Sequence, residues 1–159
     1  MKRIKLQKSK EIFDNRVPES QIGMQHSIPK DCTILIVEDI VSNFVFISSI
    51  LGSLGVNCEW KTSGYEVAEY TNSLPRLHLI LMDILLTYDD CFSVVNILRA
   101  SEQFNDVPII AMAAESSMDQ MTKAREFGFD GFLGKPIDPD RFTIQIQNIL
   151  CGDPVWELN

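Results

Sequence analysis

Short apolar runs alternate with longer amphipathic stretches from residue 32 onward. The short runs have the length of strands and are too brief for buried helices; they are Thr33–Val37, Asn57–Lys61, His78–Met82, Val107–Met112 and Gly131–Leu133. The amphipathic stretches predict helices that follow these strands, over Val41–Leu54, Tyr65–Asn72, Phe92–Ser101, Ser117–Phe127 and Pro139–Leu150. The chain therefore repeats a strand–helix unit five times.

Residues that begin and end helices stand at the predicted boundaries. Asp138 precedes Pro139, which combines a favoured N-cap residue with proline in the first helical turn. Ser116 and Ser117 are further N-cap candidates, and Gly55 and Gly128 stand where helices are expected to end. Alternation of this kind predicts a parallel sheet with helices on both faces, whose ligands bind beyond the carboxyl ends of the strands.

Charged residues follow three of the predicted strands at that functional edge. The first strand runs into Glu38 and Asp39, the third runs into Asp83, and Lys135 comes one glycine after the fifth. Acidic residues after a strand often only cap the next helix. Asp83 is harder to explain in that way, because apolar residues precede and follow it, and a carboxylate there is either costly or functional.

Three carboxylates that meet at one edge repel one another and require a cation. Oxygen ligands with room for water favour Mg²⁺, which typically takes one or two carboxylates and phosphate oxygens. A carboxylate nucleophile beside a cation and a lysine is suited to accepting a phosphoryl group. The strand ends therefore predict phosphoryl chemistry on Asp83, with Lys135 paired to the product.

Four motifs in the chain resemble the receiver domains of two-component response regulators. They are ILIVEDIVSN, LILMDILL, PIIAMAA and DGFLGKPID, in the order and spacing of that family, and the resemblance covers roughly residues 31–151. The residues of these motifs are similar to those in the receivers of hybrid sensor kinases and in single-domain regulators. The resemblance implies a flavodoxin-like (βα)5 three-layer sandwich, α/β in class, with a five-stranded parallel sheet in the order 2-1-3-4-5.

The resemblance also implies residue roles. Asp83 matches the phospho-accepting aspartate, while Glu38, Asp39 and the backbone carbonyl of Leu85 match the protein groups that hold Mg²⁺ with it. Lys135 matches the lysine that contacts the phosphoryl group. In the family that group comes from a histidine kinase or a histidine phosphotransfer protein, and phosphorylation repacks the face formed by the fourth helix, fifth strand and fifth helix. We expect a downstream protein partner on this face.

Four more features concern the conformational switch that follows phosphorylation in this family. Two of them match the family and two depart from it. The resemblance implies a cis bond before Pro136 and makes Phe132 the switch aromatic. Ala113 replaces the Thr or Ser whose hydroxyl bonds the phosphoryl group, so we expect chemistry to survive and the conformational readout to weaken. Thr87 stands where many relatives have proline, so we expect a more mobile loop over 87–90, to which Asp89 adds negative charge.

Two other functions compete with this prediction. A degenerate receiver would act as a phosphorylation-independent interaction module, but such members usually lose an acid or the lysine, and this chain keeps all four groups. A phosphatase of the haloacid dehalogenase type would need a second aspartate two residues after the nucleophile, where Leu85 stands. No GxxxxGK[ST] or GxGxxG phosphate loop occurs. We therefore predict a signalling module, not an enzyme.

Charge and composition constrain the partners and the domain limits. We expect residues 1–30 to form a basic, flexible tail with a net charge of +4; because the whole chain carries −8, the remaining residues carry −12. A domain that acidic repels nucleic acid. No apolar run is long enough to span a membrane, and four widely spaced cysteines indicate reduced thiols in a cytoplasmic protein. Residues 31–151 form the receiver and 152–159 a C-terminal tail, in which Trp156 either folds back on the domain or engages a partner.

Overall fold

The computed structural model of the chain describes residues 27–69 and 73–159. Most of the predicted basic tail, and the end of the second predicted helix, lie outside these residues. The described strands are β1 Thr33–Val37, β2 Asn57–Lys61, β3 Leu79–Asp83, β4 Ile109–Ala113, β5 Gly131–Gly134 and β6 Trp156–Glu157. The described helices are α1 Val41–Ser53, α2 Gly64–Glu69, α3 Cys91–Arg99, α4 Met118–Glu126 and α5 Pro139–Leu150, with a 3₁₀ turn, η3, at Glu102–Phe104.

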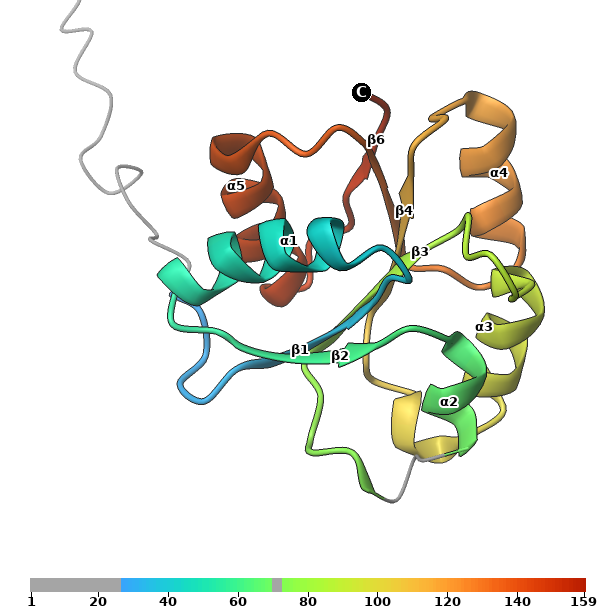
Figure 1. The fold of residues 1–159 in the computed structure, drawn as a ribbon, viewed down its shortest axis with the longest axis horizontal. Coiled ribbons are helices and arrows are strands. Elements are labelled where there is room, and N and C mark those ends of the chain that lie inside the picture. Colours follow the sequence, from blue (N-terminus) through green and yellow to red (C-terminus); the bar gives the residue numbers. More distant parts are fainter. Residues whose placement is uncertain (1–26, 70–72) are drawn as a thin grey trace, which may run out of the picture.

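The sheet has the predicted order with one strand added at its edge. All pairings are parallel, and the order is β2-β1-β3-β4-β5-β6. Helices α1 and α5 cover one face, and α2, α3 and α4 cover the other (Figure 1). The three-layer α/β sandwich is therefore confirmed. The sixth strand arises from residues 152–159, which the sequence pattern places outside the domain.

Alternate strand residues build two separate cores. In β1, Leu35 and Val37 face the α2–α3–α4 layer, whereas Ile34 and Ile36 face the α1–α5 layer, and all four are fully buried. Period-two side-chain alternation sends neighbouring residues to opposite faces, so a strand covered on both sides must be apolar throughout. This burial fixes where each strand ends, and hence where the residues after it stand.

The predicted helix boundaries hold where local chemistry specifies them. The Asp138 side chain accepts a hydrogen bond from the Arg141 backbone N–H at 2.9 Å, and Ser117 caps α4. Gly128 ends α4 with a φ of 95°, in the left-handed region that favours glycine. His78 lies just outside β3, where its Nδ1 accepts a hydrogen bond from the Thr33 N–H, an ordinary structural role. No helix among the described residues is long and apolar enough to cross a membrane.

The four cysteines differ sharply in reactivity. Cys151 is exposed, whereas Cys32 and Cys91 are buried and Cys58 is partly buried. Burial raises the pKa of the Cys58 thiol to about 11 and that of the Cys91 thiol to about 12, and it also raises the pKa of Cys32. The thiolate is the reactive form, so these three residues are protected both by access and by protonation.

We predict that iodoacetamide at about pH 8 modifies Cys151 first and leaves Cys32, Cys58 and Cys91 largely intact. A pKa of about 12 leaves roughly one thiol in ten thousand ionised at that pH. Peptide mass mapping of a time course measures the order. The urea-unfolded chain, in which all four cysteines should react, is the control; native labelling of Cys91 as fast as Cys151 contradicts the prediction.

Candidate functional site

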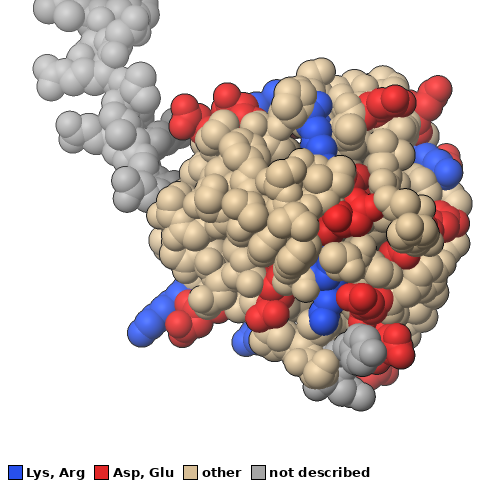
Figure 2. All heavy atoms as spheres, in the orientation of Figure 1, with Lys and Arg blue, Asp and Glu red and all other residues tan. Residues whose placement is uncertain are grey.

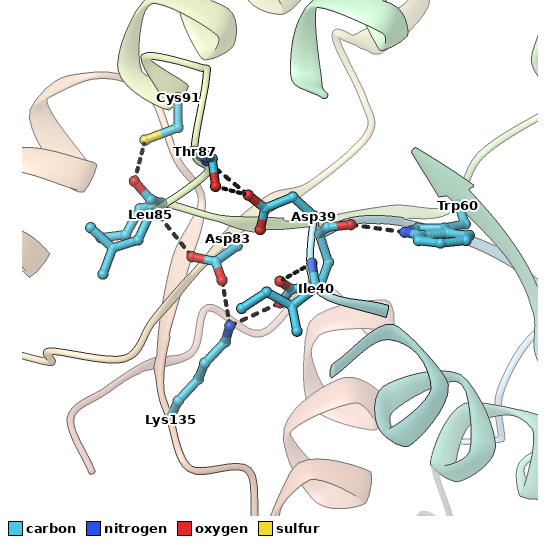
Figure 3. Close-up of polar contacts among 10 residues, drawn as sticks. Asp39, Ile40, Trp60, Asp83, Leu85, Thr87, Cys91 and Lys135 are labelled. Carbon is cyan, nitrogen blue, oxygen red and sulfur yellow. Dashed lines mark hydrogen bonds and ion pairs between the residues drawn. The ribbon is translucent and has the colours of Figure 1, made fainter. Parts of the chain in front are cut away.

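The carboxyl ends of β1, β3 and β5 bring the predicted acids and the lysine together (Figure 3). Glu38 and Asp39 follow β1, Asp83 ends β3, and Lys135 follows β5. The Glu38 side chain is fully buried, Asp83 is 5% exposed and the Lys135 side chain is 13% exposed. Four charged groups from three strand ends thus share one site at the sheet edge, in which Glu38, Asp83 and Lys135 are largely buried and Asp39 is partly exposed.

The ammonium of Lys135 joins two of these carboxylates. Its Nζ lies 2.5 Å from Asp83 Oδ2 and 2.9 Å from Glu38 Oε2. Burial works to lower the pKa of Lys135, but hydrogen bonds and charge from Asp83 and Glu38 outweigh it, so the pKa ends above its ordinary value. Lys135 is therefore a permanent cation here, and it compensates charges that would otherwise be costly to bury.

Glu38 is held in place by the backbone around it. Its Oε1 accepts a hydrogen bond from the Ile40 N–H at 3.1 Å, and its backbone carbonyl accepts one from Trp60 Nε1 at 2.8 Å. The Trp60 ring stacks on Phe44 with 4.5 Å between centroids. Burial raises the pKa of Glu38, against the opposing effect of Lys135. The charge of Glu38 therefore depends on the ammonium of Lys135 beside it.

Asp39 is oriented by the loop after β3. Thr87 donates twice to Asp39 Oδ2, from its backbone N–H at 2.9 Å and from its hydroxyl at 2.5 Å. The Thr87 hydroxyl is the main cause that lowers the pKa of Asp39. The departure from proline at position 87 thus supplies two donors, since proline has neither an N–H nor a hydroxyl. The sequence shows the residue at position 87 but gives no signal for its partner Asp39.

The remaining acids of the 87–90 loop accept hydrogen bonds from neighbouring segments of the chain. Asp89 accepts hydrogen bonds from Ser63 Oγ and, at 2.5 Å, from the Gly64 N–H at the start of α2. Asp90 caps α3 by accepting from the Phe92 N–H. These bonds tie the 87–90 loop to β1, α2 and α3. The sequence signal for this arrangement is the run TYDD, but it does not specify which donors the two acids meet.

The phospho-acceptor candidate is itself fixed. Asp83 Oδ1 accepts a hydrogen bond from the Leu85 N–H at 2.7 Å, while Oδ2 faces Lys135 (Figure 3). Leu85 is half-exposed and lies at the mouth of the site. With one oxygen on a backbone donor and the other on the ammonium, the carboxylate is held in a single orientation.

The oxygen-rich donor set fits a hard divalent cation. In the described part of the chain, no three His, Cys, Asp or Glu side chains converge closely enough to hold a metal ion as they stand. The reason is local, because Lys135 lies between Glu38 and Asp83, and Thr87 holds Asp39. Carboxylates and a backbone carbonyl, without sulfur or imidazole, are nevertheless the chemistry that Mg²⁺ prefers.

The two positions that the resemblance assigns to a switch are fully buried. Ala113 ends β4 and Phe132 lies in β5, and neither side chain is exposed to solvent. The Ala113 carbonyl accepts a hydrogen bond from the Lys135 N–H at 2.8 Å. The bond between Lys135 and Pro136 is cis, as the resemblance implies. The backbone around the switch therefore follows the expected arrangement, while position 113 offers no hydroxyl.

Comparisons with known proteins agree with this architecture. The peroxide stress-activated histidine kinase mak1 of Schizosaccharomyces pombe is 32% identical over 123 residues, which are 74% of this chain and 8% of the kinase. A structure of the receiver domain of sensor histidine kinase PA1611 from Pseudomonas aeruginosa, with magnesium in its active-site cleft, has a TM-score of 0.67 and 28% identity, covering 77% of this chain and 99% of that one.

A third similar protein comes from a complex. The co-crystal structure of the Saccharomyces cerevisiae histidine phosphotransfer protein Ypd1 with the receiver domain of the response regulator Ssk1 has a TM-score of 0.69 and 25% identity, covering 78% of this chain and 92% of that one. The chain spans only 8–54% of the first curated relatives that it matches. The family model of the response regulator receiver domain matches residues 34–147, and the chain belongs to this family of signalling modules.

Proposed function

We propose that this chain accepts a phosphoryl group on Asp83 from a phosphohistidine of a histidine kinase or phosphotransfer protein, with Mg²⁺ as cofactor. The observation that carries the proposal is the pairing of Asp83 with Lys135, at 2.5 Å, beside the acids that follow β1. A buried carboxylate with a fixed cation on one oxygen is a nucleophile prepared for an anionic phosphoryl group.

The transfer exchanges one bond to phosphorus for another. An Asp83 carboxylate oxygen attacks the phosphorus, a P–O bond forms, and the P–N bond breaks with its electron pair going to the histidine nitrogen. Lys135 stabilises the charge on the phosphoryl oxygens. Glu38, Asp39, Asp83 and the Leu85 carbonyl would hold Mg²⁺, which would supply positive charge to neutralise the phosphoryl oxygens.

An uncharged surface beside the site suits a protein donor. Helix α1 carries no charged residue, and the surface above it is almost free of acidic and basic side chains in Figure 2. A cleft of about 700 Å³ opens there between Ile40 and Phe46 on one side and Pro136 on the other, and Asp83 and Lys135 line it. Ile40 and Phe46 are about half exposed. Exposed apolar side chains around an acceptor are consistent with docking of a partner helix.

A phosphorylation-independent interaction module is the second candidate, and the observation that favours it is the buried Ala113 methyl at the hydroxyl position of the switch. The two functions can be distinguished by the chemistry at Asp83. A docking module needs no reactive Asp83, whereas a phosphoryl acceptor does.

We predict that acetyl phosphate with Mg²⁺ adds one phosphoryl group to the chain, detected by intact mass. The adduct should be absent from Asp83→Asn and after chelation of Mg²⁺, because the nucleophile or the compensating charge is then missing. Asp89→Asn is the matched control, since Asp89 bonds Ser63 and Gly64 and should leave labelling intact. An adduct that persists in Asp83→Asn would sink the proposal.

Removal of the Lys135 ammonium should leave the repulsion between the carboxylates of Glu38 and Asp83 uncompensated. We predict that Lys135→Met lowers the free energy of unfolding at neutral pH by roughly 2–4 kcal/mol, somewhat below the usual loss for a fully buried pair because the site is partly open. Without Lys135, the already raised pKa of Glu38 rises further. The folded variant then binds the proton more tightly than the unfolded chain, so its stability recovers as pH falls and is lost as pH rises.

Urea unfolding of the wild type, Lys135→Met and the exposed control Lys30→Met, at neutral and mildly acidic pH, measures this effect. An equal loss at both pH values would show that charge compensation is not the role of Lys135. A loss of similar size in Lys30→Met would show that the effect is not specific to the site.

Loss of the Thr87 hydroxyl should weaken Mg²⁺ binding through Asp39. In Thr87→Val the backbone N–H still bonds Asp39, so we expect an affinity about threefold to tenfold lower, less than a full charged hydrogen bond would give. Isothermal titration calorimetry measures it. Thr143→Val removes a hydroxyl bonded only to backbone within α5 and serves as control. Unchanged affinity in Thr87→Val means that Thr87 does not position Asp39 for the metal.

A further inference from the structure

Residues Val155–Asn159, named here the β6 segment, lie along the outer edge of β5. The Phe132 N–H donates to the Val155 carbonyl at 2.9 Å, Phe132 pairs with Trp156, and Leu133 pairs with Glu157. Figure 1 shows β6 and the chain end between α4 and α5. An edge strand would otherwise present unpaired backbone groups. The β6 segment therefore covers the edge that β5 would leave open.

The first side-chain anchor of this segment is on α4. The Arg125 guanidinium lies 4.3 Å from the Trp156 ring centroid, in a cation–π contact. Trp156 and Leu158 also pack, partly buried, against the core cluster that contains Phe132. Since paired residues of parallel strands project to the same side of a sheet, Trp156 lies beside Phe132. The tryptophan thus joins α4 to the strand that carries the switch aromatic.

The second anchor is on α5. Glu157 Oε2 accepts hydrogen bonds from Arg141 Nε at 2.9 Å, from Arg141 Nη2 at 2.6 Å and from Gln145 Nε2 at 2.7 Å. Charge-assisted bonds of this kind are among the stronger polar contacts. At the end of the segment, the Asn159 N–H donates to Ser116 Oγ in the loop between β4 and α4. The segment is therefore attached to α4, β5 and α5 together.

Two glycines of β5 leave room for the passing backbone. A Cβ on Gly134 would lie 2.6 Å from the Asn159 backbone N, and a Cβ on Gly131 would lie 2.6 Å from the Val155 carbonyl oxygen. Real Cβ atoms essentially never approach other atoms so closely. The receiving strand GFLG thus accommodates a neighbouring strand at both of its ends, an observation independent of the anchors.

We propose that the α4–β5–α5 face is a strand-binding surface whose resident ligand is the chain's own β6 segment. A downstream protein that uses this face must first displace the segment, and the fitting competitor is an extended peptide with an aromatic residue followed by an acid. The inference concerns residues outside the phosphoryl site and does not depend on phosphorylation.

The β6 segment binds in preference to a free peptide because it is covalently part of the chain. A tethered ligand is present at an effective concentration of about millimolar, so a free peptide with the same sequence competes poorly until the tethered copy is weakened. Only two residues of the segment form ladder pairs, and its largest side-chain contacts with the flanking helices come from Trp156 and Glu157. Loss of one anchor should therefore open the face without unfolding the domain.

The experiment uses a fluorescein-labelled peptide of residues 153–159, DPVWELN, and the whole chain. We expect weak binding to the wild type and to the control Ile144→Ala, an exposed α5 position. Trp156→Ala should bind the peptide at least about tenfold more tightly in fluorescence anisotropy, because the tethered copy has lost its anchor. Hydrogen exchange at the Phe132 amide should accelerate in the same variant.

Gly134→Ala provides an independent variant that leaves the β6 segment itself intact. Its Cβ should displace the β6 segment and exclude the free peptide in the same way. Hydrogen exchange at the Phe132 amide should therefore rise while peptide binding stays weak. Peptide binding should also stay weak in the double variant that combines Gly134→Ala with Trp156→Ala. Equal peptide affinity in wild type and Trp156→Ala, with unchanged exchange, overturns the proposal. So does a wild-type dimer whose Phe132 protection falls on dilution, because the occupant is then a second copy.

Discussion

The ammonium of Lys135, bonded to two buried carboxylates, is the contact on which the site depends. Asp83 and Glu38 come from neighbouring strands and stand at the same edge because the parallel register places the ends of β1 and β3 side by side. Buried acids without a cation would repel each other and take up protons. The lysine, arriving from β5 on the far side of β4, bonds both carboxylates and so holds them together at one point of the sheet edge.

Hydrogen bonds with the surrounding loops hold the charged side chains of the site in fixed orientations. Thr87 turns Asp39, Leu85 directs one Asp83 oxygen, and Asp89 joins the same loop to the start of α2. Leu85 and Thr87 donate from the segment immediately after β3, and Asp89 of the same segment accepts from the Gly64 N–H, so this one loop orients acids that follow two strands. A carboxylate cluster held by backbone donors loses little freedom when a ligand arrives, which favours both ion binding and transfer chemistry.

The fold and the charged cluster were accessible from sequence because their signals are local or additive. Apolar runs and N-cap residues defined the strand–helix units, and the position of Asp83 after a buried run indicated its special role. The partners of Thr87 and Asp89 were not accessible, since a hydroxyl or carboxylate in a loop does not specify which distant group it meets. The β6 strand was missed for a related reason: Trp156–Glu157 is too short to show a period, and its stability comes from Arg125 and Arg141.

Under the proposed function, the β6 segment and Ala113 bear on the same step, the passage of a signal from Asp83 to the surface. Position 113 has no hydroxyl to follow a phosphoryl group, and Phe132 is already buried with Trp156 beside it. Yet β5 links the two regions directly, because Gly134 lies against Asn159 and precedes Lys135. A shift of Lys135 toward a new anion therefore bears on the backbone that holds the segment. The structure therefore offers a contact path from Lys135 to the β6 segment through the backbone of β5, whereas the side chain at position 113 has no polar group to take part in one.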